Sequence, residues 1–356
     1  MKTIQSNTYP IYFDNSIAEL VKFIKQGNYS RFFILTDENT ELHCLPVIKN
    51  ELGDIDNYDL IEIPAGEENK DIDFCIGIWR MLIDFGADRK SLLINLGGGV
   101  ISDMGGFAAS TFKRGIDFVH VPTTLLSQVD ASVGGKTGID INSIKNIIGT
   151  FTQPKAVFIN YNFLKTLPQR QILSGLAEML KHGLIMDTGY WNLLRKSDLS
   201  MPSAELIYRS IEIKNKVVIE DPTEQGIRKA LNFGHTIGHA VETNSLINDA
   251  NPLTHGEAIA IGMICEAYLS HKKTGLSSGE LTEIVDVIKS LYPQYPVKEK
   301  SYSDLLAIML KDKKNLNGKI NCTLLTRIGE CSLDNICTEE ELCGSLSYYN
   351  ELGAIR

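Results

Sequence analysis

The chain has 356 residues, of which 43% are hydrophobic and 22% are charged. This balance argues against intrinsic disorder, and the length predicts two domains. The net charge of −9 argues against general affinity for nucleic acid or anionic membranes. No stretch approaches the ~18 consecutive apolar residues of a membrane span, and the N-terminus lacks the apolar core of a signal peptide. Seven cysteines without a CxxC pair predict a reduced, soluble, cytoplasmic protein.

The first half alternates short apolar runs with helical stretches. Strands are predicted at Arg31–Thr36, Leu60–Pro64, Ser91–Leu96, Asp117–Val121 and Ala156–Ile159, and a helix at Ile72–Phe85. Strands separated by helices of this length predict βαβ units and a parallel sheet. We therefore expect an α/β domain with a mostly parallel sheet.

Polar or glycine residues follow several of these strands. Asp37 and Asn39 follow the first, Gly66–Lys70 follows the second, and Gly97–Gly99 follows Ser91–Leu96. The carboxyl ends of parallel strands meet at one edge of an open sheet, where ligands bind. The glycines also lead into a predicted helix, whose free N–H groups can hold a phosphate. Because the GxGxxG pattern is absent, a simple tight turn remains an equal alternative.

A second polar cluster contains Gly134-Gly-Lys-Thr-Gly138. It lacks the GxxxxGK[ST] spacing of a P-loop and does not directly follow a strand, which argues against that interpretation. We expect a glycine-rich loop that presents Lys136 to an anionic ligand.

The second half reads as helical. From Pro168 to about Lys311 the apolar residues recur with a period near 3.6, and no strand is predicted. Asp221-Pro222 and Asn251-Pro252 are expected to interrupt the helices. A late β-like run, Ile320–Leu325, precedes Gly329. We therefore place a domain boundary near Leu167-Pro168.

A polar stripe is predicted in this helical half. Relative to Arg228, the residues Asn232, His235 and His239 lie at offsets of 4, 7 and 11. At about 100° per residue, one helix would direct all four side chains along an arc of roughly 60°. A solvated polar face is the alternative, but the surrounding segment is apolar and interrupted by glycines.

Glu178, His235 and His255 would make a set of two histidines and one carboxylate. Such a set leaves a position open for substrate, which is typical of a catalytic metal site. Lys181 lies three residues after Glu178 and therefore shares its helix face. Because the three ligands come from separate segments, spacing alone leaves ordinary structural roles open.

Together these segments resemble the 3-dehydroquinate synthase family of the shikimate pathway. The matching stretches are GGGVISD, FKRG, PTTLLSQVDASVGGKTGID, FLKTLP, GLAEMLKHG, LNFGHTIGHA, HGEAIAIGM and DKK, in the family's order. The resemblance implies an NAD-binding α/β domain over residues 1–167 and a helical metal- and substrate-binding domain over 168–356. It also implies a homodimer, a small anionic sugar phosphate as substrate, and no nucleic-acid or membrane partner.

The resemblance also implies roles for individual positions. NAD would be contacted by Asp37, Asn39, Glu67, Lys70, Gly98, Gly99, Val100, Asp103, Thr123, Thr124, Lys136, Lys145, Phe163 and Thr166. Zinc or cobalt would be held by Glu178, His235 and His255. The substrate carboxylate would be held by Lys136, Arg228 and Asn232, and its phosphate by Asn146, Lys181, His239 and either Lys313 or Lys314. Arg114 would enter the neighbouring site of a dimer, and Asp130 and Lys214 would lie near the reacting hydroxyls.

The implied reaction converts 3-deoxy-D-arabino-heptulosonate 7-phosphate to 3-dehydroquinate and phosphate. NAD would oxidise the C5 hydroxyl transiently, which makes the neighbouring proton removable, and the metal would stabilise the developing oxyanion. Phosphate would then leave, the hydride would return, and an aldol step would close the ring, with Lys214 and His235 helping to move the hydroxyl proton. The alternatives are a sugar phosphate cyclase for a substrate without a carboxylate, a metal-dependent polyol dehydrogenase, and a non-catalytic nucleotide-binding module.

Two departures from the family pattern stand out. Ser102 replaces a glycine of GGGVIGD, and its side chain is expected to shift the bound pyrophosphate slightly. The segment between His239 and His255 is a few residues longer than usual, which a surface loop tolerates at little cost.

Overall fold

A computed structural model describes residues 2–13, 15–53, 55, 58–141, 144–311 and 319–354. The chain folds into two compact units, Met1–Pro168 and Gln169–Arg356. Both units contain many buried apolar side chains.

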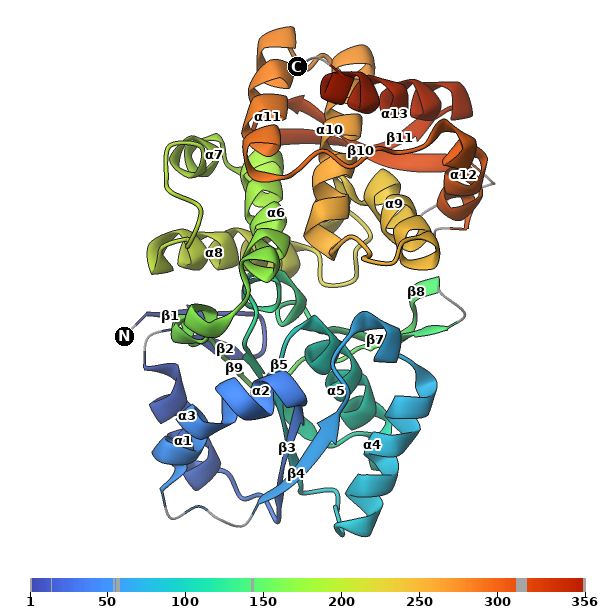
Figure 1. Ribbon diagram of the computed structural model, residues 1–356. Helices are drawn as coiled ribbons and strands as arrows, with labels where there is room; N and C mark the ends of the chain where they lie inside the picture. Colours follow the sequence, from blue (N-terminus) through green and yellow to red (C-terminus); the bar gives the residue numbers. More distant parts are fainter. Residues whose placement is uncertain are drawn as a thin grey trace. The chain divides into compact units, whose positions relative to one another are not determined.

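The N-terminal unit is built on a seven-stranded sheet with the order β1-β2-β9-β6-β5-β3-β4 (Figure 1). Its strands are β1 (Thr3–Gln5), β2 (Pro10–Tyr12), β3 (Phe32–Asp37), β4 (Tyr58–Ile63), β5 (Leu92–Gly97), β6 (Asp117–Pro122) and β9 (Val157–Phe158). Only β1 and β2 pair antiparallel within this sheet, and the other neighbouring strands pair parallel. The predicted α/β class with a mostly parallel sheet is therefore confirmed.

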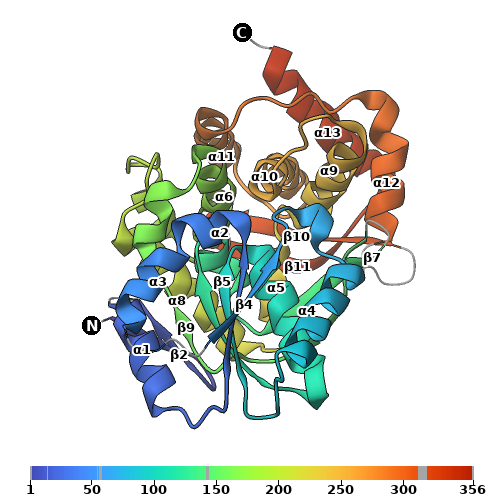
Figure 2. The same ribbon diagram turned by 60° about the horizontal axis from the view of Figure 1, so that its bottom comes forward.

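Helices cover both faces of this sheet (Figure 2). They are α1 (Ser16–Gln26), α2 (Glu38–His43), α3 (Leu45–Leu52), α4 (Ile72–Asp84) and α5 (Gly99–Thr111), with short helical turns η1 (Glu67–Asn69), η2 (Phe112–Arg114), η3 (Ser127–Ala131) and η4 (Tyr161–Thr166). Successive residues of β3 face opposite sides. Phe33 packs with α4 and α5 in one core, whereas Ile34 packs with α1 and α3 in the other. This two-sided burial explains why the predicted central strands are almost continuously apolar.

The carboxyl ends of the central strands lie at one edge of the sheet. The parallel register pairs Leu35 with Asn95 and Gly97 with Pro122, so Asp37, Gly97 and Pro122 end their strands near the same edge. Helix α5 begins at Gly99, immediately after β5. The predicted strand-to-helix turn is therefore present.

Two parts of this unit differ from the sequence prediction. Strands β1 and β2 were not predicted, and neither was the antiparallel hairpin of β7 (Lys136–Ile141) and β8 (Ile144–Phe151). Lys136 is the first residue of β7 rather than part of a loop. The glycine-rich turn lies just before Lys136. Gly134 and Gly135 have φ values of 111° and 65° there, which residues with a side chain disfavour.

The C-terminal unit is mostly helical, as predicted (Figure 1). Its helices are α6 (Gln169–Met186), α7 (Thr188–Leu194), α8 (Ala204–Glu220), α9 (His235–Asn248), α10 (His255–Lys273), α11 (Ser278–Leu291), α12 (Tyr302–Leu310) and α13 (Glu339–Ala354), with turns η5 (Ile227–Asn232) and η6 (Glu299–Ser301). The predicted late strand is β10 (Ile320–Arg327), which forms a hairpin with β11 (Glu330–Cys337). Among the described residues, no helix is long and apolar enough to cross a membrane.

The prediction of one helix spanning Arg228 to His239 is wrong. Arg228 and Asn232 belong to the 3-10 turn η5, and α9 begins only at His235. Gly234 separates the two with a left-handed φ of 82°. A Cβ at Gly234 would lie 2.6 Å from Met263 Cγ, so close packing against α10 fixes this break.

Candidate active site

Three residues of the predicted metal set approach one another in the C-terminal unit. His235 is the first residue of α9, His255 is the first residue of α10, and Glu178 lies inside α6. The Glu178 side chain is fully buried, and its Oε1 lies 3.5 Å from His235 Nε2 and 3.6 Å from His255 Nε2. Two ligands of one tetrahedral zinc, each at about 2.0–2.1 Å, would lie roughly 3.4 Å apart. The donor atoms therefore fit a zinc-like divalent ion.

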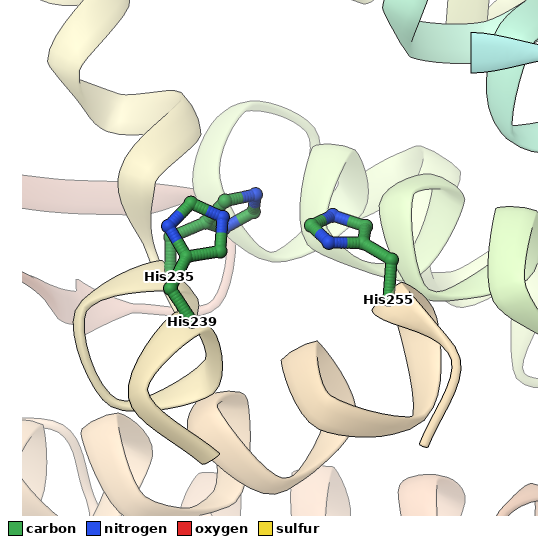
Figure 3. A group of neighbouring side chains, drawn as sticks. All are labelled: His235, His239 and His255. Carbon is green, nitrogen blue, oxygen red and sulfur yellow. The ribbon is translucent and has the colours of Figure 1, made fainter. Parts of the chain in front are cut away.

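His239 lies beside this set. It comes one turn after His235 on α9, and its ring centre is 5.0 Å from that of His235 and 5.7 Å from that of His255 (Figure 3). Ligand nitrogens of His235, His239 and His255 all lie within 4.8 Å of one another. The cluster thus offers two possible ligand sets that share His235 and His255. The set with Glu178 combines two imidazoles with a carboxylate and leaves a fourth position open, which is typical of a catalytic zinc site.

Contacts on the far side of each ring orient the two shared histidines. Nδ1 of His235 lies 3.1 Å from the carbonyl oxygen of Phe233, and Nδ1 of His255 lies 3.2 Å from Glu242 Oε2. With Nδ1 engaged, Nε2 of each ring is directed to Glu178 and is the available ligand atom. Burial opposes charge on His255, but the Glu242 and Glu178 carboxylates outweigh it and raise the pKa of His255 to about 9.

Two buried lysines belong to the same unit. Lys181 forms an ion pair with Glu178 Oε2, and its side chain is only 1% exposed. Lys214, on α8, is 6% exposed. Burying an ammonium group is costly unless it is paired. Lys181 therefore balances the charge of the buried carboxylate.

Arg228 and Asn232 contact the loop that follows α8, residues 221–226. Asp221 accepts hydrogen bonds from the backbone N–H groups of Gln225, Gly226 and Arg228, at 3.0, 2.6 and 3.1 Å. Burial opposes ionisation of Asp221, but these hydrogen bonds outweigh it and lower its pKa.

The side chains of both residues contact this loop. Nη1 of Arg228 donates to the Pro222 carbonyl oxygen at 2.7 Å, and Nδ2 of Asn232 donates to Glu224 Oε1 at 3.1 Å. Asn232 thus already binds a carboxylate oxygen in this structure.

The N-terminal unit brings together five residues predicted for NAD or phosphate. Lys70 Nζ donates to Asp103 Oδ2 at 2.6 Å and to Asn146 Oδ1 at 2.7 Å. Lys145 Nζ donates to Glu67 Oε1 at 3.3 Å, and Lys70 Nζ is 3.9 Å from the same oxygen. Burial disfavours the charged form of Lys70, but the surrounding carboxylates raise its pKa above the ordinary value. These side chains form one polar network, in which Lys70 is buried and Glu67 is partly exposed.

The glycine turn between β5 and α5 is shaped for close approach. Gly98 is the N-cap of α5 and supplies no side-chain cap, so the first N–H groups of this helix are available to an anion. A Cβ at Gly98 would lie 3.0 Å from Thr124 Cγ2. Ser102, four residues after Gly98, is buried, and its Oγ lies 3.1 Å from Ser127 Oγ.

The other predicted residues of this unit occupy varied positions. Asp37 caps α2, because its Oδ1 accepts from the Thr40 N–H at 2.8 Å, and Asn39 is exposed on that helix. Phe163 is packed in the α1/α3 core, and Thr166 Oγ1 donates to the Phe163 carbonyl oxygen at 3.2 Å. The remaining predicted residues lie in α5 (Val100), after β6 (Thr123), in η3 (Asp130) and, exposed, in η2 (Arg114). Lys313 and Lys314 lie outside the described residues.

Sequence reasoning missed two carboxylates next to the histidines. Glu242 contacts His255, and Glu266 accepts hydrogen bonds from the first turn of α9. Helical periodicity places each of them on the same helix face as a histidine, but it does not show which group the carboxylate contacts. At about 100° per residue, Glu242 lies about 20° from His235, seven residues earlier, and Glu266 lies about 20° from His255, eleven residues earlier.

Residues 60–174 match the N-terminal domain of 3-dehydroquinate synthases, and residues 175–315 match their C-terminal domain. The chain belongs to the 3-dehydroquinate synthase family. The 3-dehydroquinate synthase of Parabacteroides distasonis is 44% identical over 338 residues, which cover 94% of this chain and 95% of that protein. The 3-dehydroquinate synthase of Caldanaerobacter subterraneus is 38% identical and covers 95% and 97% of the two chains.

Solved structures of sugar phosphate cyclases share this fold. The 2-epi-5-epi-valiolone synthase of Streptomyces hygroscopicus, solved with NAD⁺ and Zn²⁺ bound, is 26% identical, with a TM-score of 0.87 and 99% of both chains covered. A 2-deoxy-scyllo-inosose synthase complexed with carbaglucose-6-phosphate, NAD⁺ and Co²⁺ is 22% identical, with a TM-score of 0.86 and coverage of 98% and 99%. A probable glycerol dehydrogenase from Sinorhizobium meliloti shares the fold at 13% identity, with a TM-score of 0.63 and coverage of 97% and 98%.

Proposed function

We propose that this member of the 3-dehydroquinate synthase family converts 3-deoxy-D-arabino-heptulosonate 7-phosphate to 3-dehydroquinate and phosphate, as a phosphate-eliminating lyase. Family membership over most of the chain supports the reaction. The observation that carries its chemistry is the approach of Glu178 Oε1 to Nε2 of both His235 and His255. This arrangement leaves room for substrate oxygens on a bound ion.

The N-terminal unit supplies the proposed NAD site. The uncapped N-terminus of α5 would hold the pyrophosphate, and Gly98, Gly99 and Thr124 would allow its close approach. A polar network would line the same site, because one of its members, Asp103, lies in the first turns of α5. Its side chains are those of Glu67, Lys70, Asp103, Lys145 and Asn146. The other proposed NAD contacts are Asp37, Asn39, Val100, Thr123, Lys136, Phe163 and Thr166.

The C-terminal unit supplies the proposed metal and substrate groups. When bound, NAD would exchange a hydride with the substrate, and a zinc or cobalt ion would polarise its hydroxyls. Glu178, His235 and His255 would hold that ion. Arg228 and Asn232, with Lys136, would bind the substrate carboxylate, and Lys181 and His239, with Asn146, would bind the phosphate.

Side chains of this protein would move the proton of the reacting hydroxyl. Lys214 and His235 would help to move the proton of the reacting hydroxyl, and Asp130 would lie near the hydroxyls. Lys214 is buried on α8, in the same unit as the proposed metal ligands. A homodimer in the cytoplasm, with Arg114 reaching the neighbouring site, completes the proposal.

Substrate discrimination tests this proposal. Purified protein is given NAD and zinc with one of three compounds: the heptulosonate phosphate, a hexose 6-phosphate without a carboxylate, or glycerol. We expect phosphate release only from the first compound, and no release by the His235→Ala variant. Phosphate release from the hexose phosphate alone would identify a different cyclase, and NADH accumulation with glycerol would identify a dehydrogenase.

A further inference from the structure

Helix α9 begins without a capping side chain of its own. Its N-cap is Gly234, which has no side chain, and its first residue is the proposed metal ligand His235. The first N–H groups of an α-helix have no partner within the helix, and leaving them unbonded in a buried place is costly. Another part of the chain must therefore satisfy them.

Glu266, on α10, supplies the missing cap from 30 residues away. Its Oε2 accepts from the Gly234 N–H at 2.6 Å, and its Oε1 accepts from the N–H groups of Thr236 and Ile237 at 3.1 and 3.2 Å. The side chain is fully buried. A carboxylate at the positive end of a helix, with several N–H donors, is stabilised as the anion. The three bonded groups flank His235 on both sides.

The two helices also cross too closely for either to shift independently. A Cβ at Gly262 of α10 would lie 1.9 Å from the Gly234 carbonyl oxygen, and a Cβ at Gly238 would lie 3.0 Å from the Ala258 carbonyl oxygen. Helix α10 also begins with the second histidine, His255. Helix α10 therefore supplies the ligand His255 and, through Glu266, fixes the backbone that carries the ligand His235.

We propose that Glu266 is a positioning residue of the metal site, which sets the distance between His235 and His255 by capping α9 in place of a local side chain. The inference rests on the proposed metal-binding function. Glu266 does not bind the ion. It acts through the backbone on either side of His235, so its loss should change the metal geometry and not only the stability of the fold.

The test is Glu266→Gln, in which the amide has one acceptor oxygen and must turn its NH₂ group toward at least one N–H donor. We expect Zn²⁺ and Co²⁺ to bind about tenfold to a hundredfold more weakly, which is the range for residues that orient metal ligands. We also expect the visible spectrum of the Co²⁺-loaded protein to change, because it reports ligand geometry. NAD affinity should be unchanged. In a His235→Ala background the same substitution should not weaken residual metal binding further.

Glu280→Gln is the matched control. Glu280 also accepts backbone hydrogen bonds on both carboxylate oxygens, from the Ile328 N–H at 3.0 Å and from the Ser277 N–H at 3.1 Å. It lies in the first turn of α11, which carries no proposed ligand. We expect this variant to lose stability with unchanged metal affinity. If Glu266→Gln does not fold, Glu266→Asp, which keeps the charge but shortens the reach, is expected to weaken metal binding in the same direction.

The outcomes separate the two proposals. Unchanged metal affinity and Co²⁺ spectrum in the folded Glu266 variant, alongside clear loss of metal in His235→Ala, would overturn the role of Glu266 alone. An equal effect of Glu280→Gln would also overturn it. A wild-type chain that binds neither ion would overturn both the positioning role and the proposed metal site.

Discussion

Oε2 of Glu242 lies 3.2 Å from Nδ1 of His255 and so directs Nε2 of that ring to the Glu178 carboxylate. Both glutamates are buried, with side-chain exposures of 3% and 0%. The imidazole is therefore held between a carboxylate that orients it and a carboxylate that would share a metal ion with it.

Removing the Glu242 carboxylate should weaken metal binding. In Glu242→Gln the orienting charge is lost while the shape of the side chain is kept, so we expect metal affinity to fall about tenfold or more. Zinc content after dialysis against buffered free zinc measures this, and excess zinc should restore activity. Glu212→Gln, at an exposed position on α8, is the control and should match the wild type. Full metal content in Glu242→Gln would show that the contact does not orient a ligand.

Replacing Arg228 by lysine should separate charge from geometry. Lysine keeps the charge but lacks the planar fork that binds a carboxylate with two parallel hydrogen bonds. We expect KM for the heptulosonate phosphate to rise about tenfold or more, with a smaller change in kcat. Lys229→Met, at a neighbour that pairs with Asp334 at 3.0 Å, serves as the control in steady-state kinetics. A KM equal to that of the wild type would remove Arg228 from the carboxylate site.

Ser102 should contribute to stability and not to NAD affinity. Its Oγ lies 3.1 Å from Ser127 Oγ, and the side chain is buried. Ser102→Ala leaves the Ser127 hydroxyl without this partner, which should cost about 1 kcal/mol of unfolding free energy. The Ser102→Ala/Ser127→Ala double variant should lose less than the sum of the single variants. Urea denaturation and NAD titration measure both effects, and a clear change in NAD affinity would support the expected shift of the pyrophosphate instead.

His120 should make the protein less stable in mild acid. Burial lowers its pKa to about 3, and the Asn95 amide lies 3.3 Å from its Nδ1. A histidine kept neutral by folding takes up a proton only on unfolding, so its stability contribution is present above its unfolded pKa of about 6.5 and is lost as the pH falls. Between about pH 7 and about pH 5 this loss is about 2 kcal/mol. Urea denaturation at both pH values should show a correspondingly smaller loss for His120→Gln; equal losses would contradict the assignment.

The pattern of apolar residues was sufficient to predict most of the strands and helices. Long apolar runs such as Ser91–Leu96 and Asp117–Val121 correspond to the central strands β5 and β6, which are buried on both faces. The three-residue strands β1 and β2 offer too short a pattern to detect. The single helix predicted from Arg228 to His239 failed because Gly234 adopts a left-handed conformation against α10, and that tertiary contact leaves no periodic signal.

The residue types of the candidate site could be predicted from the sequence, whereas the contacts around them could not. The histidines and Glu178 were found from motif and spacing, and the structure places them within a few ångströms of one another. The groups that orient them were not found, because Glu242 and Glu266 read as ordinary helix residues until α9 and α10 are packed together. A carboxylate that binds backbone N–H groups 30 residues away cannot be inferred from local sequence.

In the proposed reaction, a bound NAD is reduced and reoxidised within one catalytic cycle. The most direct measurement is phosphate released from the heptulosonate phosphate at limiting NAD, with NADH absorbance followed in the same sample. We expect many phosphates per NAD and no net NADH, with release abolished by a chelator and restored by zinc. Release that stops at one phosphate per NAD, with an equal amount of NADH formed, would show that NAD is consumed and not recycled.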